Sequence, residues 1–212
     1  MKPLRPLLLA LALLSMATAH AASRWHDISV RGDVPRLGFA ATDAASGHTV
    51  TAADFRGKIV LLYLGYTNCP DVCPLTMHRI AVVLHRLGKG AADIRVLFVT
   101  VDPHRDTLPV LRRYVGLFGP DFIGLRADPN QLARLARRYR LAYSVDPGGD
   151  GHPYTVTHSP AVYVFDRTGA ARLLIPSLAS TTPDLRGVTA DLRRLLRGDT
   201  AQGWFGWLAR WV

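Results

Sequence analysis

The segment Ile59-Val-Leu-Leu-Tyr-Leu-Gly-Tyr-Thr-Asn-Cys-Pro-Asp-Val-Cys-Pro74 decides the fold. Its first half, residues 59–66, is a near-continuous apolar run, which is typical of a parallel strand buried on both faces. Apolar residues then recur at helical spacing, and Gly88 follows as a stop signal, so a helix is predicted over residues 74–87. The two cysteines, Cys69 and Cys73, therefore lie in the turn between a buried strand and a helix.

Strands and helices alternate on the C-terminal side of this unit. Strands are predicted at residues 94–101, 122–125, 161–165 and 172–175, and helices at residues 107–118, 128–139 and 182–196. The turn-rich residues 22–56 predict an irregular segment with one hairpin. This order predicts an α/β fold with a mixed central sheet and helices on both faces.

The composition is that of a globular protein. The chain has 212 residues, of which 49% are hydrophobic and 20% charged, and this excludes a disordered, collagenous or coiled-coil chain. The formal net charge is +10, but the arginines are scattered, and their local clusters lie on helix-like stretches without interleaved aromatic residues. We therefore expect no nucleic-acid partner and instead an attraction to anionic membranes or acidic proteins. No repeat or linker divides the chain, so residues 22–200 form one predicted domain.

The N-terminus carries the features of an export signal. Lys2 and Arg5 precede the apolar stretch Leu7 to Ala19, and Ala19-His20-Ala21 provides a small-residue cleavage site. Residues 1–21 are therefore predicted to be a signal peptide, which directs the protein to the periplasm. The alternative is a retained anchor helix, although the apolar stretch is shorter than the roughly 20 residues that span a bilayer.

The C-terminus, residues 201–212, is rich in tryptophan. Trp204, Trp207, Leu208 and Trp211 share one face if this tail is helical. Either the tail packs on the domain, or it lies in the interfacial layer of the inner membrane, which tryptophan favours.

The cysteine pair allows three interpretations. A structural disulfide would close a very small ring, for which the entropic gain is smallest. A redox dithiol would use Cys69 and Cys73 as catalytic residues, with the helix dipole favouring a thiolate at Cys73. A metal site is the third: two thiolates are too few for structural zinc but suit Cu(I), particularly with one added imidazole. A thiol peroxidase, with Arg105 as the activating base, is a weaker fourth alternative.

Three blocks of sequence resemble one known family. They are Gly65-Tyr-Thr-Asn-Cys-Pro-Asp-Val-Cys-Pro74, then Val101-Asp-Pro-His-Arg-Asp-Thr107, then Thr157-His158-Ser159. Together they resemble the Sco/SenC family of copper-handling proteins over residues 57–168. The resemblance implies a thioredoxin-like fold.

The resemblance also implies a site and a partner. Copper, as Cu(I) or Cu(II), would be bound by Cys69, Cys73 and His158, with His104 and His152 as the next candidates for the imidazole. The protein would deliver copper to the CuA centre in subunit II of cytochrome c oxidase, or reduce its cysteines. Another periplasmic copper carrier or a thiol reductant would be a further partner.

The chain departs from the family pattern in two places. Asn68 stands where the family most often has histidine, beside Cys69. The N-terminal segment is predicted to be cleaved, whereas the family usually carries an N-terminal membrane anchor.

Several residues near the predicted site have simpler expected roles. We expect Asp71 to be a turn residue and Met77 to lie in the core. Asp102 and Asp106 are expected to cap the helix that follows them. By analogy with thioredoxin-like proteins, we expect a cis Ser159–Pro160 bond.

Overall fold

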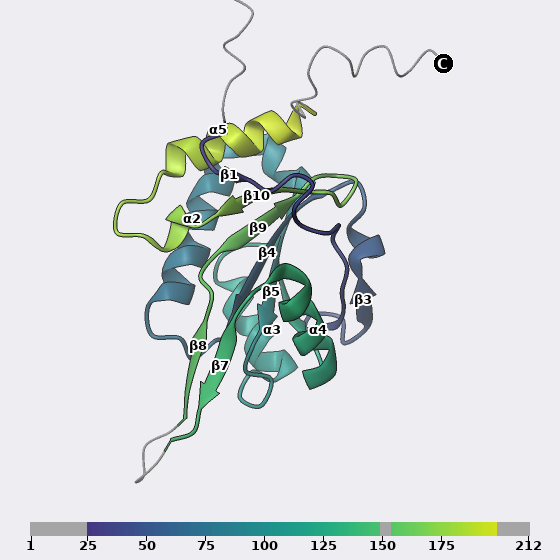
Figure 1. The fold of residues 1–212 in the computed structure, drawn as a ribbon, viewed down its shortest axis with the longest axis vertical. Helices are drawn as coiled ribbons and strands as arrows, with labels where there is room; N and C mark the ends of the chain where they lie inside the picture. Colours follow the sequence, from purple (N-terminus) through teal and green to yellow (C-terminus); the bar gives the residue numbers. More distant parts are fainter. Residues whose placement is uncertain (1–24, 149–153, 199–212) are drawn as a thin grey trace, which may run out of the picture. The chain divides into compact units, whose positions relative to one another are not determined.

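A mixed eight-stranded sheet forms the centre of the fold in this computed structural model, which describes residues 25–148 and 154–198 (Figure 1). The described residues from His26 onwards belong to one compact unit. The predicted signal peptide, the tryptophan-rich tail and His152 lie outside the described residues. In sheet order, the strands are β1 (Ile28–Ser29), β10 (Ala171–Ile175), β9 (Val162–Phe165), β4 (Ile59–Gly65), β5 (Ile94–Thr100), β6 (Phe122–Arg126), β2 (Ala40–Asp43) and β3 (Thr49–Thr51).

Parallel pairing is confined to the middle of the sheet. β4 lies parallel to β5 from the Ile59–Ile94 pair to the Gly65–Thr100 pair, and β5 lies parallel to β6. All other neighbouring strands are antiparallel. Every residue of β4 is buried, because the strand lies at the centre of the sheet with helices on both faces.

In the part of the chain that the structure describes, four α-helices cover the two faces of the sheet. They are α2 (Val72–Leu87), α3 (Leu108–Gly116), α4 (Pro129–Tyr139) and α5 (Leu185–Leu196). The ring of Tyr114 on α3 contacts Phe98 of β5, on the face where α2 also lies, and α5 packs against α2. On the opposite face, Tyr139 of α4 contacts Tyr163 and Phe165 of β9. The predicted fold class is therefore confirmed.

Most element boundaries follow the prediction, and the exceptions have local causes. Helix α2 begins at Val72, two residues before the predicted start, and Pro74 is tolerated in its first turn. Helix α5 begins at Leu185, because the Asp184 side chain accepts a hydrogen bond from the Gly187 N–H and ends the preceding loop. The predicted N-terminal hairpin is formed by β2 and β3.

A separate two-stranded ribbon was not predicted. It consists of β7 (Tyr143–Asp146) and β8 (Thr155–His158), and most of its side chains are exposed. Because this stretch has no buried apolar run, its pattern did not predict strands. No helix among the described residues is both long enough and apolar enough to cross a membrane.

A buried carboxylate holds the start of the described domain on α5. Asp191 is 2% exposed, and its side chain accepts the N–H groups of His26 at 2.8 Å and Asp27 at 2.9 Å. Burial, with the nearby charges of Asp191 and Asp184, raises the pKa of the Asp27 carboxyl to about 7. The folded protein therefore favours a protonated Asp27, and its stability falls as pH rises from about 4, the usual aspartate pKa, towards 7.

We predict that Asp27→Asn raises the melting temperature at pH 8, because asparagine cannot acquire the desolvated charge. The gain should shrink towards zero at pH 4, which is close to the usual aspartate pKa and well below the raised pKa of Asp27 in the folded protein. Thermal unfolding followed by circular dichroism at both pH values measures this. The exposed Asp33 provides a matched control, since Asp33→Asn should show no such pH dependence. Equal melting temperatures of Asp27→Asn and wild type at pH 8 would contradict the prediction.

Candidate metal centre

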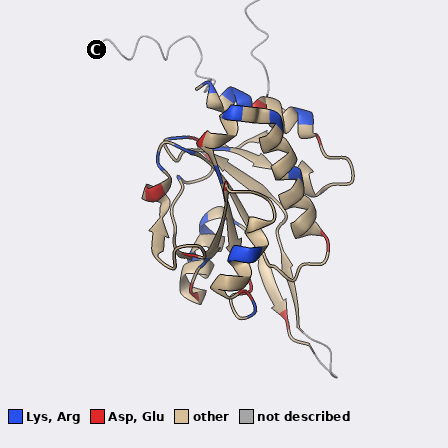
Figure 2. Cartoon of the chain, turned by 180° about the vertical axis from the view of Figure 1, so that it is seen from behind, with Lys and Arg blue, Asp and Glu red and all other residues tan. Residues whose placement is uncertain are grey.

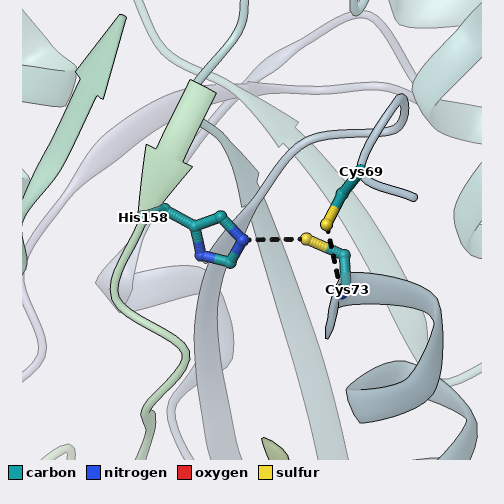
Figure 3. A group of neighbouring side chains, drawn as sticks. All are labelled: Cys69, Cys73 and His158. Carbon is teal, nitrogen blue, oxygen red and sulfur yellow. Dashed lines mark hydrogen bonds between the residues drawn. The ribbon is translucent and has the colours of Figure 1, made fainter. Parts of the chain in front are cut away.

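Three side chains from separate segments converge at one end of the sheet (Figure 3). Cys69 lies in the loop after β4, Cys73 in the first turn of α2, and His158 at the end of β8. Their two sulfurs and one ring nitrogen all lie within 4.8 Å of one another. The Cys73 Sγ atom is 3.0 Å from His158 Nε2. The structure thus brings together the three residues that the sequence singled out.

The backbone fixes the tautomer of His158. Its Nδ1 atom is 3.1 Å from the carbonyl oxygen of Ser159, which can only accept, so Nδ1 carries the proton. Burial lowers the pKa of the imidazole, which favours the neutral ring. Nε2 therefore presents its lone pair to the two sulfurs. The rings of Tyr63 and Tyr66 stand edge-on to the imidazole, with centroids 5.8 Å and 5.9 Å away, and limit its rotation.

The two cysteines are free thiols with different surroundings. Cys73 is fully buried, and burial raises the pKa of its thiol to about 12. Cys69 is half-buried and accepts the N–H of Cys73, at the start of α2, with an N–S distance of 3.4 Å. The expectation of a thiolate at Cys73 was therefore wrong, because desolvation outweighs the helix dipole there. The helix N-terminus is directed at the sulfur of Cys69 instead.

Gly65 leaves the space that the Cys73 sulfur occupies. A Cβ atom at Gly65 would lie 2.9 Å from Cys73 Sγ and 2.6 Å from Cε2 of Phe98. Both distances are shorter than a normal van der Waals contact. The glycine in an otherwise bulky apolar strand was a sequence signal for such a close approach.

Asp106 connects the loop of residues 66–71, which carries Cys69 and is called the cysteine loop below, to the sheet through hydrogen bonds. Its side chain is fully buried and accepts hydrogen bonds from the Thr67 N–H at 3.0 Å and the Thr67 hydroxyl at 2.6 Å. It also accepts the hydroxyl of Thr100, at the end of β5, at 2.5 Å. The expected capping role was wrong, because Thr107 is the N-cap of α3 and the Asp106 carboxylate points away to these three donors.

The loop between β5 and α3, which carries Asp106, also holds the ribbon of β7 and β8, in which His158 lies. The hydroxyl of Tyr154 donates to Asp102 at 2.6 Å, and Arg105 Nε donates to the same carboxylate. The Arg105 guanidinium stacks 3.9 Å from the centroid of the Tyr154 ring. It also donates a hydrogen bond to the backbone carbonyl oxygen of Tyr154 at 3.2 Å. Asp102 therefore does not cap α3 either. Arg105 and Tyr154, whose roles sequence reasoning did not find, anchor the start of β8.

Two clefts flank Cys69. One, of about 530 Å³, is lined by Tyr66, Arg105, Tyr154 and neighbouring residues, and the other, of about 250 Å³, by Val156, His158 and neighbouring residues. Cys69 lines both clefts. A partner's side chains can therefore reach the Cys69 sulfur, whereas Cys73 is fully buried.

The remaining expectations have mixed outcomes. Met77 is fully buried in the core, as expected, and Asp71 is exposed and precedes α2 without a side-chain capping bond. His104 is exposed and does not belong to the cluster.

The expected cis Ser159–Pro160 bond was wrong, since the described residues contain no cis peptide. Hydrogen bonds between Ser159 and Ala142 continue the β7–β8 pairing as far as the residue before Pro160.

We predict that Gly65→Ala displaces Cys73, and that Cu(I) affinity and the melting temperature both fall, because the added methyl group overlaps the thiol and the Phe98 ring. Competition with a Cu(I) chelator and thermal unfolding measure the two effects. Gly116→Ala is the matched control, since a Cβ at Gly116 meets nothing within 4 Å. Unchanged affinity in Gly65→Ala would show that the sulfur position is not constrained by this glycine.

The sequence matches known proteins over most of its length. The model of the SCO1/SenC family matches residues 37–197. The mitochondrial protein SCO2 homolog of Bos taurus is 41% identical over 150 residues, covering 70% of this chain and 55% of that protein. Its Homo sapiens counterpart is 37% identical over 125 residues, covering 58% of this chain and 47% of that protein. The chain thus matches about half the length of these curated relatives.

The solved structures that resemble this chain are also Sco proteins. Bradyrhizobium japonicum ScoI with copper bound is 36% identical, with a TM-score of 0.66 over 76% of this chain and 98% of that one. Arabidopsis thaliana ScoI with copper bound is 28% identical, with a TM-score of 0.67 over 77% of this chain and 98% of that one. The fold is therefore the thioredoxin-like fold of Sco proteins, as expected. This chain belongs to the SCO1/SenC family.

Proposed function

We propose that this protein binds copper through Cys69, Cys73 and His158 and delivers it to the CuA site in subunit II of cytochrome c oxidase. The observation that carries the proposal is the convergence of two sulfurs and one imidazole nitrogen within 4.8 Å. Copper in two solved relatives and the description of Sco proteins as cytochrome c oxidase assembly proteins support it.

The donor set fits copper. Two soft thiolates and an imidazole suit Cu(I) in a three-coordinate site, and they are one ligand short of a structural zinc site. The Nε2 lone pair of His158 already points at Cys73, so little rearrangement is needed. Because the pKa of Cys73 is raised to about 12, its thiol releases a proton when it binds the metal. The clefts beside Cys69 leave room for an additional oxygen ligand, which Cu(II) would tolerate.

Delivery would proceed by ligand exchange. Cys69 is the ligand that lines both clefts, so an acceptor thiolate of similar softness reaches the copper on that side. Cys73 and His158 would hold the ion until the acceptor has supplied its own ligands. We further propose that the protein acts in the periplasm after export by residues 1–21, and that another periplasmic carrier supplies the copper.

A second candidate function is thiol–disulfide exchange, favoured by the pairing of an accessible Cys69 with a buried Cys73. The Cys69 thiolate would attack one sulfur of a partner disulfide, breaking that bond and forming a mixed disulfide. The partner thiolate released in that step would take the proton of the Cys73 thiol, and the Cys73 sulfur would then attack Cys69. This forms an internal disulfide and releases the partner's second sulfur, which takes a proton from water, so the partner leaves as a dithiol. The partner gains two electrons, and a thiol reductant of the periplasm must reduce the protein again.

We predict one-to-one binding of Cu(I) that is lost in Cys69→Ser and Cys73→Ser and weakened in His158→Ala. Removing a ligand should cost more than the roughly 10–100-fold that loss of an outer-sphere partner costs. The measurement is an anaerobic titration of the reduced protein against a competing Cu(I) chelator.

His85→Ala is the matched control, because His85 is exposed on α2 and outside the cluster. It should bind copper as the wild type does. Full affinity in His158→Ala would remove His158 from the ligand set, and full affinity in either serine variant would overturn the copper site.

The two candidate functions should separate in His158→Ala. This variant keeps both thiols, so it should still reduce an oxidised soluble CuA domain of subunit II, while failing to load the reduced domain with copper. Free thiols of the acceptor and the CuA absorption bands measure the two reactions. Copper loading at the wild-type rate by this variant would contradict delivery through His158. Wild-type protein that reduces the domain but never loads it would leave only the reductase function.

A further inference from the structure

The outward face of α5 is basic. Its inner face buries Val188, Leu192 and Leu195 against the domain. Arg186 and Arg193 are exposed and lie seven residues apart, so they share the outer face of the helix. Figure 2 marks Lys and Arg positions in blue along this helix.

The end of α2 extends this positive surface. Arg193 donates to the carbonyl oxygen of Arg86 at 3.1 Å, which brings the two helices together. Arg86 and Lys89 are both exposed, and a Cβ at Gly90 would lie 3.0 Å from Leu196 at the end of α5. We call Arg86, Lys89, Arg186 and Arg193 the α5 basic face.

Nearby carboxylates do not neutralise this face. Asp191 is buried and holds two backbone N–H groups, and Asp184 lies 3.7 Å from His26 at the start of α5. Asp93 is bound by Lys58 and Arg167. Among the described residues, no salt bridge involves any of the four cations of the α5 basic face.

Both ends of the described domain lie at α5. The backbone of His26 is hydrogen-bonded to Asp191 of α5, and Gly198 follows the end of the same helix. The tryptophan-rich segment is close in sequence, since Trp204 lies six residues after Gly198.

We propose that the α5 basic face rests on an anionic phospholipid surface. Its positive charge is complementary to anionic headgroups, and both ends of the described domain lie at this helix. Helix α2 runs from Cys73 to Arg86, which is about 20 Å at 1.5 Å per residue. The cluster of Cys69, Cys73 and His158 is therefore held above the lipid surface, facing a partner that protrudes from the same membrane. This surface is independent of the copper ligands.

The test compares binding of the full chain to vesicles of equimolar phosphatidylglycerol and phosphatidylcholine with binding to pure phosphatidylcholine. The variant Lys89→Gln/Arg186→Gln/Arg193→Gln removes three exposed cations. Its partition coefficient on the anionic vesicles should fall on the order of 100-fold, with no change on the neutral ones. A second readout is trypsin cleavage after Arg197, which anionic vesicles should slow in the wild type but not in the variant. The cleavage readout remains informative if the apolar segments of the chain bind it to both kinds of vesicle, because it reports contact of α5 with the lipid rather than partition.

The matched control is Arg112→Gln/Arg134→Gln/Arg137→Gln, which removes three exposed cations from α3 and α4. It should retain wild-type partition and protection. An equal loss in the control would overturn the proposal in favour of a general effect of net charge. Wild-type behaviour of the α5 variant would overturn it too, and would leave an acidic protein as the partner of this face. Cu(I) binding should be unchanged in both variants, which keeps this test separate from that of the copper site.

Discussion

The buried carboxylate of Asp106 is the constraint on which the geometry of the site depends. It lies at the ends of the central strands, where it binds Thr100 of β5 and Thr67 of the cysteine loop. A buried carboxylate is stable only when its oxygens are hydrogen-bonded. The three hydrogen bonds therefore hold Thr67, Thr100 and Asp106 in one relative position. Thr67 is thereby held two residues before Cys69. The position of the first cysteine thus follows from a hydrogen-bond network rather than from the strand–helix turn alone.

The loop that carries Asp106 also holds the other half of the cluster. Through Asp102 and Arg105 it binds Tyr154 at the start of β8, four residues before His158. One loop therefore sets the distance between the cysteines and the imidazole. A preformed donor set lowers the cost of ordering the ligands when a metal binds. The same arrangement, with one accessible and one buried thiol, also suits exchange with a partner disulfide, which explains why copper delivery and thiol reduction are compatible with one site.

The sequence predicted the regular elements well and the polar contacts poorly. Strands β4 and β5 and helix α4 were found because their burial or amphipathic pattern is local and strong. The ribbon of β7 and β8 was missed because it is short, polar and exposed. Capping by Asp106 and a thiolate at Cys73 were plausible from neighbours along the chain. Both were wrong because the Asp106 carboxylate pairs with distant residues, and because the Cys73 sulfur is enclosed by residues that only the fold brings near it.

The sequence by itself determined the α/β class, the place of both cysteines between a buried strand and a helix and, through the resemblance, His158 as their partner. These depend on periodicity and on short motifs, which a linear chain displays directly. The tertiary structure decided which cysteine is buried, which tautomer His158 adopts, why residue 65 is glycine and which cations of α2 and α5 lie near one another. Cys73 and His158 are 85 residues apart, and Thr67 and Asp106 are 39 apart. Burial and hydrogen bonding between such distant residues are properties of the packed chain, because the surroundings of each group exist only after folding.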